Sequence, residues 1–434
     1  MSGKTRQILA LFYIILKLLI KIFLRDSLRG VWKNQTRPCL PLACPCSTLL
    51  CVEKNYDVII SGGGPAGAAA GRVLAENGVS VLVLDKSEFP RPKLCGGLLT
   101  HKTVRAVARI FGESAETLKQ RGIIDHESDR FGVHYLDKPL CQGESRFPFY
   151  FVRRESFDHF LLDLARQAGA RTLAGHKVDS CDPKSGRVRT VLGECFSGRF
   201  VLGADGVFSA VRKCFPLAQA DKTAWRGNLA TAVEAVLDPR LLPDPAAYPK
   251  IFLGVINAGY GWVFPNSDRF LVGLCGLNRS NTDFKARLYG FLRFLGVSGP
   301  KEIACKGHPL PYGNFITHPV FENALLAGDA AGFVDPILGE GIYYALVSGS
   351  LAARSILESL NHGANLARTY ARFLKRDVYT ELVCSRRLRA LLYACQRHIH
   401  PRWPVALLLR LCASRFVELA HGARSFKWLR KREI

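Results

Sequence analysis

The sequence lacks the patterns that mark several common protein classes. Acidic residues are scarce beside basic ones, since 36 Asp and Glu against 60 Lys and Arg give a formal net charge of +24. No zinc-finger or RNA-recognition signature accompanies this charge, which argues against a nucleic-acid partner. The basic residues near both ends of the chain stand beside aliphatic and aromatic ones, a pattern that favours contact with an anionic membrane surface.

Cysteines in the Cys-x-x-Cys spacing are also missing. The fourteen cysteines are scattered along 434 residues, which is typical of reduced thiols in a cytoplasmic protein and not of a disulfide framework. The densest group is Cys39, Cys44, Cys46 and Cys51. This group has neither the Cys-x-x-Cys spacing nor the histidine of common zinc sites, so no metal is predicted.

A long uncharged hydrophobic run is absent as well. Residues 8–24 are almost entirely apolar, but Lys17 and Lys21 interrupt them, and too short an uncharged run remains to span a bilayer. No small-residue cleavage pattern of a secretory signal follows. Two interpretations of residues 1–51 stay open: an amphipathic anchor lying on a membrane surface, or an upstream extension that the fold does not need. The expected location is cytoplasmic, with peripheral contact at the inner membrane face.

A strand, a glycine-rich turn, a helix and a second strand are predicted between Tyr56 and Asp85. The turn carries Gly62, Gly64 and Gly67 in the pattern G-x-G-x-x-G, and Asp85 ends the second strand 21 residues after Gly64. Such a turn lets the backbone approach a pyrophosphate at the helix N-terminus, and the acid accepts from a ribose hydroxyl. An incidental glycine turn is the alternative, but the agreement of all four elements favours a dinucleotide site.

Two later segments select the dinucleotide. The segments 200–212, FVLGADGVFSAVR, and 324–336, ALLAGDAAGFVDP, each read as a strand ending in a Gly- and Asp-containing turn. Together they resemble the second and third flavin motifs of the family that includes para-hydroxybenzoate hydroxylase. The resemblance implies FAD, with Asp329 on the ribityl chain and the following glycine-rich loop, including Gly332, at the isoalloxazine.

Two further motifs, RPKLCGGLL at 91–99 and GYGWVFP at 259–265, resemble those of the geranylgeranyl reductase family, and the likeness extends from Tyr56 to about Leu360. In that family the cysteine and glycines of the first motif lie beside the flavin, and the aromatic motif lines the substrate cavity. Arg154, in RESFD, matches a flavin-contacting arginine. Relatives often carry proline where this chain has Asn257. This departure leaves the particular substrate open and affects the assignment to the family less.

The motifs define the candidate site residues. Tyr260, Trp262 and Cys95 are the predicted catalytic residues, with an ordinary buried aromatic cluster and an inert thiol as the plain alternatives. The predicted cofactor-binding residues are Gly62, Gly64, Ala66, Gly67, Asp85, Lys86, Cys95, Gly96, Gly97, Arg154, Val178, Asp205, Gly206, Asp329, Gly339, Gly341 and Ile342.

The resemblance implies reduction of carbon–carbon double bonds in a prenyl lipid or quinone side chain. Because only one dinucleotide fingerprint is present, the electron donor is expected to be NAD(P)H docking transiently or a ferredoxin-like carrier. An FAD-dependent monooxygenase or halogenase is the first alternative, although halogenases of this fold typically show W-x-W-x-I-P where this chain has YGWVFP. An electron-transfer flavoprotein at a membrane is the second, but no cysteine cluster for iron–sulfur binding follows the flavin motifs.

The predicted fold is α/β, with a Rossmann-type FAD-binding domain, an inserted antiparallel-sheet substrate domain and a helical C-terminus. The FAD domain is expected to combine residues 52–100, 151–216 and 320–361, and the substrate domain residues 101–150 and 217–319. Residues 362–434 are expected to be helical and basic. For Arg386, Arg387, Arg389 and Arg397 a solvated basic face and a lipid-docking face are both open.

Overall fold

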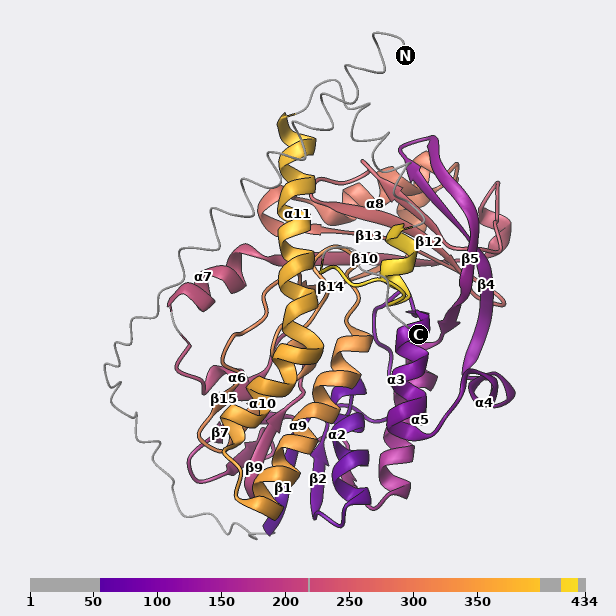
Figure 1. Ribbon diagram of the computed structural model, residues 1–434. Helices are drawn as coiled ribbons and strands as arrows, with labels where there is room; N and C mark the ends of the chain where they lie inside the picture. Colours follow the sequence, from indigo (N-terminus) through magenta and orange to yellow (C-terminus); the bar gives the residue numbers. More distant parts are fainter. Residues whose placement is uncertain (1–54, 218, 399–414, 428–434) are drawn as a thin grey trace. The chain divides into compact units, whose positions relative to one another are not determined.

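The computed structural model describes residues 55–217, 219–398 and 415–427. The described residues all lie within one compact unit, Leu50–Ile434, which is built on two eight-stranded sheets (Figure 1). The predictions made for residues 1–51, including the amphipathic anchor and the group of four cysteines, fall outside the described residues.

The first sheet is the predicted Rossmann-type sheet. Its order is β15-β16-β9-β1-β2-β6, with β8 pairing β9 and β7 pairing β8. The pairs β1–β2, β1–β9, β2–β6 and β9–β16 are all parallel. The strands are β1 (Asn55–Ser61), β2 (Val81–Leu84), β6 (Arg171–Leu173), β7 (Val178–Asp182), β8 (Arg187–Thr190), β9 (Cys195–Gly203), β15 (Val320–Phe321) and β16 (Ala324–Leu326).

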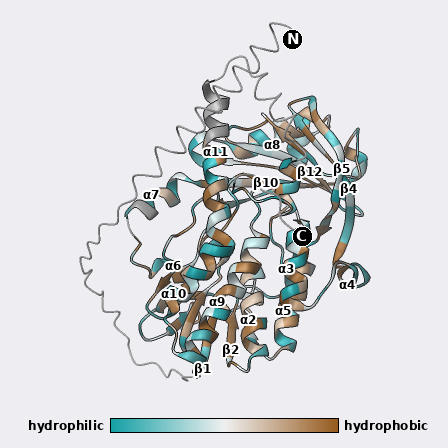
Figure 2. Ribbon diagram, in the orientation of Figure 1, coloured by the Kyte–Doolittle hydropathy of each residue, from teal (hydrophilic) through white to brown (hydrophobic). Residues whose placement is uncertain are grey.

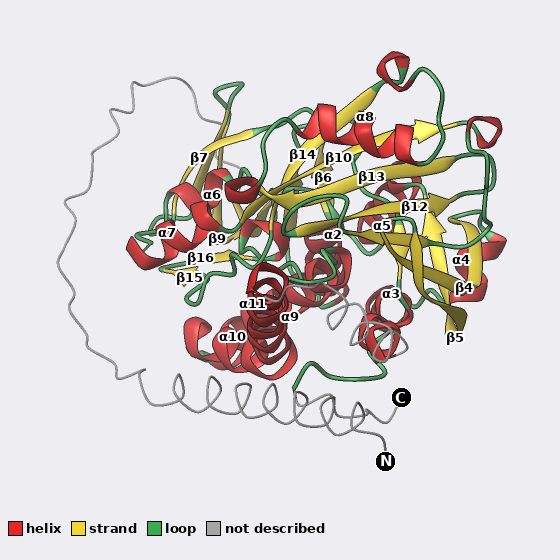
Figure 3. Cartoon of the chain, turned by 90° about the horizontal axis from the view of Figure 1, so that it is seen from above, coloured by secondary structure: helices red, strands yellow, loops and turns green. Residues whose placement is uncertain are grey.

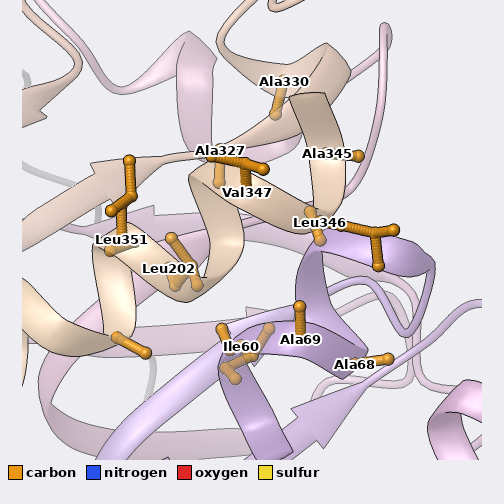
Figure 4. Packing of buried hydrophobic residues seen from close by; sticks show 14 of the residues in the cluster. Ile60, Ala68, Ala69, Leu202, Ala327, Ala330, Ala345, Leu346, Val347 and Leu351 are labelled. Carbon is orange, nitrogen blue, oxygen red and sulfur yellow. The ribbon is translucent and has the colours of Figure 1, made fainter. Parts of the chain in front are cut away.

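Helices cover the first sheet, and small residues let them approach closely. Helix α2 (Pro65–Glu76) contacts both α5 (Arg154–Gln167) and α9 (Ile342–His362). A Cβ atom at Gly349 of α9 would lie 2.1 Å from the carbonyl oxygen of Ala66, so only glycine permits this crossing. Figure 4 shows side chains of α2 and α9 in one apolar cluster with Ile60 and Leu202 of the central strands. Consecutive residues Val58, Ile59 and Ile60 of β1 are all fully buried, so both faces of this central strand are covered, and its ribbon is coloured as hydrophobic in Figure 2.

The second sheet is curled and mostly antiparallel, as predicted, in the order β14-β10-β13-β12-β11-β4-β5-β3. The exception is the parallel pair β4–β11. Its strands are β3 (Leu98–Leu99), β4 (Ile124–Tyr135), β5 (Lys138–Val152), β10 (Leu229–Leu237), β11 (Lys250–Leu253), β12 (Gly259–Pro265), β13 (Phe270–Leu277) and β14 (Cys305–Pro311). Helix α8 (Phe284–Phe294) packs over β10 and β13 (Figure 3).

The remaining helices lie between and after the sheets. After α9 the described chain is helical over 366–398 and again over 415–420, which confirms the predicted helical C-terminal region. The helices that precede α9 and have not yet been described are α3 (His101–Phe111), α4 (Ala115–Gln120), α6 (Ala210–Lys213) and α7 (Gln219–Gly227). Those that follow α9 include α10 (Leu366–Leu374), a π-helix (Lys375–Tyr379) and α11 (Thr380–His398). Among the described residues, no helix is both long enough and apolar enough to cross a membrane.

The division into two domains stays a prediction. The strands of the first sheet come from the three segments assigned to FAD binding, while β3 and the end of β5 belong to the second sheet. Helix α3, which was assigned to the substrate domain, contacts α2 and α9 of the first sheet's helical layer.

Candidate active site

A cavity of about 870 Å³ is lined by residues from loops of the first sheet and from strands of the second. Every residue of the predicted catalytic and cofactor-binding sets except Gly67 lines it, whereas Gly332, which the resemblance placed near the isoalloxazine, does not. Gly67 packs directly beneath the glycine turn, where a Cβ atom would lie 1.9 Å from the carbonyl oxygen of Gly62. The three glycine motifs meet here because β1, β9 and β16 are parallel and end at the same edge of the sheet.

The glycine turn leads from β1 into α2 and brings backbone amides to the cavity. Gly62 has a φ of +103°, and a Cβ atom there would lie 2.4 Å from Ala204 O. Pro65 occupies the first turn of α2, where its missing N–H costs no helical hydrogen bond. Gly64, Pro65 and Ala66 line the cavity, so the N-terminus of α2 offers a site for a phosphate.

Asp85 holds the glycine turn and faces the cavity. Its Oδ2 accepts from the amide of Gly63 at 2.7 Å, and its Oδ1 accepts from the amide of Ser87 at 2.9 Å. Arg91 lies near the same carboxylate, with Nε 3.7 Å from Asp85 Oδ1. The acid predicted to bind a ribose thus also fixes the end of β2 to the turn.

A buried ion pair underlies the Cys95 loop. Arg154 Nε and Nη2 donate to the two carboxylate oxygens of Asp158, each at 2.8 Å. Burial alone lowers the pKa of Arg154, but the Asp158 carboxylate and the neighbouring Cys95 raise it above that of an ordinary arginine. The guanidinium is therefore fixed in place and permanently charged at the cavity wall.

Other charges converge on the same part of the cavity. The pKa of Lys93 is lowered, because burial outweighs the opposing effect of nearby Asp329. The pKa of Asp329 is raised, because burial outweighs the opposing effects of Lys93 and Arg154. Burial, Lys93, Lys86 and Arg154 together lower the pKa of His308 to about 4. His308 is therefore neutral at pH 7, and the lysines and Arg154 make this part of the cavity suited to an anionic group.

The residues present fit FAD. Asp205 Oδ2 accepts from the amide of Ala210 at 2.8 Å, whereas its Oδ1 and Arg91 Nε are buried without a hydrogen-bond partner although both residues line the cavity. Unpaired buried polar atoms call for a partner. The hydroxyl and phosphate groups of a dinucleotide supply such partners. The turn at Gly62 also leaves the close backbone approach that a pyrophosphate needs.

The loop with Gly339 and Gly341 is held by side chains that the sequence analysis did not identify. Asp335 Oδ1 accepts from the amides of Ile337 and Leu338, each at 2.8 Å, and from Ser385 Oγ at 3.0 Å. Tyr312 donates to Ile337 O at 2.8 Å, and Tyr260 donates to Leu338 O at 2.5 Å. The Tyr260 hydroxyl therefore positions this loop.

Glu340 extends this support to α3. Its Oε2 lies 2.6 Å from Lys102 Nζ, and its Oε1 accepts from Thr100 at 2.7 Å and from Thr103 at 3.0 Å. Asp335 and Glu340 stand in the same Gly-rich segment as Asp329. Their nearness to the predicted flavin motif could have identified them as site residues from the sequence. Lys102 carries no comparable signal, because its partner lies more than two hundred positions away.

The aromatic motif forms one wall of the cavity. Trp262 lies between two glycines: a Cβ atom at Gly273 would be 2.3 Å from Trp262 Cζ2, and one at Gly96 would be 2.6 Å from Phe264 and 3.4 Å from Trp262 Nε1. The ring centroid of Trp262 lies 6.1 Å from that of Tyr260 and 6.2 Å from that of Phe264. The Cys95–Gly97 loop thus packs directly against the aromatic wall.

Glu234, on β10, is a buried acid behind this wall that the sequence analysis missed. It faces the indole N–H of Trp262, the amide of Cys95 and the charge of Arg269. Neither Glu234 Oε2 nor Trp262 Nε1 completes a hydrogen bond of normal geometry. Burial raises the pKa of Glu234 to about 7, against the partial opposing effect of these neighbours.

Replacing Glu234 by glutamine is expected to remove a pH-dependent loss of stability. Unfolded glutamate titrates near pH 4.5 and folded Glu234 near 7, so between these values the folded protein binds more protons and wild-type stability falls as pH rises. The loss is complete above pH 7 and amounts to roughly 3 kcal/mol.

Urea unfolding across this pH range measures the difference between Glu234→Gln and wild type. We expect the variant to gain stability relative to wild type from pH 4.5 to 7.5, while Glu322→Gln, at an exposed position, follows wild type. A difference that does not vary with pH would contradict the assignment.

The C-terminal arginines are only partly available as a basic face. Arg389 is buried, donates to Tyr312 O, and donates to Asn228 Oδ1 at 2.7 Å. Arg386 stacks on Phe315 with its guanidinium carbon 4.5 Å from the ring centroid. Arg386 and Arg387 are both exposed, and the side chain of Arg397 lies outside the described residues. Within the described part of the chain no cluster of His, Cys, Asp and Glu is arranged to hold a metal ion.

The chain is similar to known FAD-binding proteins. The FAD binding domain family matches residues 55–271. The chain is 30% identical to menaquinone reductase of Mycobacterium tuberculosis, over 82% of this chain and 88% of that protein. It is 29% identical to geranylgeranyl diphosphate reductase of Rhodobacter capsulatus, over 74% and 80%. A geranylgeranyl bacteriochlorophyll reductase-like structure from Thermoplasma acidophilum has the same fold, with a TM-score of 0.66 at 21% identity, covering 87% of this chain and 94% of that one.

Proposed function

The chain belongs to the geranylgeranyl reductase family of FAD-dependent oxidoreductases, and on that premise we propose that it reduces carbon–carbon double bonds in the prenyl chain of a lipid or quinone. Two of its relatives are named as reductases of menaquinone and of geranylgeranyl diphosphate, both prenyl compounds. Identity near 30% supports the prenyl class and leaves the individual substrate as a proposal.

The aromatic and aliphatic lining beside the Cys95–Gly97 loop is the observation that carries this proposal. Trp262 and Phe264 stand against that loop, and Phe131, Val133 and Leu310 extend the apolar lining. A prenyl chain offers no polar group to bind, so an apolar cavity must hold it by shape. The same lining excludes water from the reacting bond.

Each predicted catalytic residue has a proposed task. Reduced FAD, when bound, would supply a hydride to one carbon of the double bond, and a proton from a protein or solvent acid would go to the other carbon. Trp262 orients the double bond, and Tyr260 holds the Gly339 loop through its hydrogen bond to Leu338 O. Cys95 lines the cavity beside Arg154, and we place its thiol among the groups that contact the reacting atoms.

The partners follow from the same chemistry. NAD(P)H or a ferredoxin-like carrier is the proposed electron donor, since one dinucleotide fingerprint is present in the sequence. A prenyl substrate dissolves in a bilayer, so we propose a cytoplasmic location with peripheral contact at the membrane.

Product analysis tests the proposal. Chemically reduced holoenzyme is incubated without oxygen with menaquinone or with geranylgeranyl diphosphate, and the products are analysed by mass spectrometry after any quinol has been returned to the quinone in air. We expect a gain of two hydrogen atoms for each bond reduced and no added oxygen. Products that form only with oxygen, and that carry an added oxygen or halogen atom, would replace the reductase by a monooxygenase or halogenase.

A further inference from the structure

The C-terminal segment 415–427, here called the C-terminal strap, forms part of the cavity wall. Residues 415–420 are helical, and Phe416, Val417 and Ala420 line the cavity. These three positions lie on one helical face, since residues three and four apart are neighbours on a helix. Val417 packs against the cluster that contains Phe131, Phe149 and Trp262. The strap therefore meets the same apolar lining that is proposed to hold the prenyl chain.

The strap is fastened at its far side to α3. His421 Nδ1 accepts from the backbone amide of His101 at 3.1 Å, and the His421 ring lies 4.4 Å from the ring of Phe149, centroid to centroid. A Cβ atom at Gly422 would lie 3.0 Å from Lys102 Cβ. Lys102 is the residue whose ammonium pairs with Glu340, so the strap rests on the element that also supports the Gly339–Gly341 loop.

A second fastening joins the strap to α11. Glu381 accepts from Ser425 Oγ at 2.5 Å and from the amide of Phe426 at 2.9 Å. Leu419 is only 2% exposed, and Phe426 is buried. Both fastenings lie in the second half of the strap, at His421 and at Ser425–Phe426, and with the buried Leu419 they position the helical turn that carries Phe416, Val417 and Ala420.

We propose that the C-terminal strap determines which prenyl chains the cavity admits, with Phe416 and Ala420 setting the room available for the chain. This inference rests on the proposed prenyl substrate and adds the residues that select among substrates of that class. An apolar pocket discriminates by volume, and one methylene more or less changes selectivity roughly 10–200-fold. A change of several carbon atoms at the wall is thus large enough to alter the accepted chain length.

Two substitutions with opposite effects on the volume of the cavity test the proposed role of the strap. Ala420→Leu places a larger side chain in the cavity and reduces its volume, whereas Phe416→Ala removes a ring from the wall and enlarges the cavity. Arg415→Ala, at an exposed position of the same helical turn, is the matched control. Binding of geraniol, farnesol and geranylgeraniol to the FAD-loaded proteins is followed by the change in flavin fluorescence, so no turnover is needed. Flavin content and thermal unfolding check that each variant is folded.

We expect Ala420→Leu to weaken geranylgeraniol binding by about tenfold or more relative to geraniol, Phe416→Ala to shift preference toward the longer chain, and Arg415→Ala to match wild type. Equal shifts for all three alcohols, no shift in either folded variant, or wild-type protein that binds none of them would overturn the proposal. Length-dependent binding without any alkene reduction would uphold the strap and reject the proposed function, so the two failures are distinguishable.

Discussion

Replacing Gly67 by alanine is expected to abolish FAD binding and to destabilise the protein even without FAD. The new Cβ atom would lie 1.9 Å from Gly62 O and 3.2 Å from Ile60 Cγ2. The first neighbour is a backbone atom of the turn itself, so the overlap is relieved only by moving the turn away from α2. A forced rearrangement of this kind costs roughly 3–5 kcal/mol.

Two neighbouring glycines provide the controls. A Cβ atom at Gly64 would meet only Arg91 Nη2, at 3.5 Å, and one at Gly71 would make ordinary contacts with Val83 and Ala165 at 3.5 and 3.6 Å. Gly64→Ala is expected to fold but to bind FAD weakly, because its methyl group occupies the path of the pyrophosphate. Gly71→Ala is expected to bind FAD normally and to gain about 0.5–1 kcal/mol from the helix.

FAD content and thermal unfolding of the apoproteins separate these outcomes. The expected order of apoprotein stability is Gly71→Ala, wild type and Gly64→Ala together, then Gly67→Ala well below. If Gly67→Ala retains FAD as Gly71→Ala does, the close packing of the turn on α2 is wrong.

Trp262→Ala is expected to lower kcat by about a hundredfold while leaving FAD bound. The indole fills the space over Gly273 and beside Gly96, so its loss enlarges the cavity and lets the double bond move relative to the cofactor. A displacement of about 1 Å costs roughly a hundredfold in rate. Trp262→Phe keeps an aromatic wall and should lose less.

A core substitution of similar size controls for stability. Phe291 is 3% exposed and belongs to the apolar cluster under α8. Large-to-small changes at either aromatic residue cost roughly 3–5 kcal/mol, so Phe291→Ala should destabilise as Trp262→Ala does while retaining kcat at a temperature where both are folded. Equal losses of kcat in the two variants would remove the case for an orienting role of Trp262.

The fold was largely predictable because its signals are local. The apolar run Val58–Ile60, the glycine turn and Asp85 together specify strand, turn, helix and strand within thirty residues. The motifs at 200–212 and 324–336 end in the same way and predict parallel neighbours, and β9 and β16 join the first sheet as expected. The parallel pairing of β4 with β11 carries no local signal, since it depends on how the second sheet curls.

The support of the site was not predictable, because it depends on contacts between distant positions. Thr100 bonds Glu340 across 240 positions, and His101 bonds His421 across 320. Arg389 was open to interpretation as a surface charge, but Tyr312 O and Asn228 provide partners that allow its burial. Glu234 lies on a strand with an otherwise mostly apolar sequence. Its burial beside Trp262 and Cys95, which raises its pKa, depends on strands and loops that meet only in the folded protein.

The rate at which reduced enzyme is reoxidised in the absence of oxygen tests the central claim most directly. Stopped-flow absorbance of the bound flavin is recorded after mixing anaerobic, reduced wild-type protein with geranylgeranyl diphosphate, which has no quinone ring to accept electrons in place of the double bonds. The account predicts that the oxidised flavin spectrum returns only when a prenyl substrate is added, with one flavin reoxidised for each double bond reduced. Reoxidation that requires admitted oxygen, whether or not a prenyl compound is present, would contradict it.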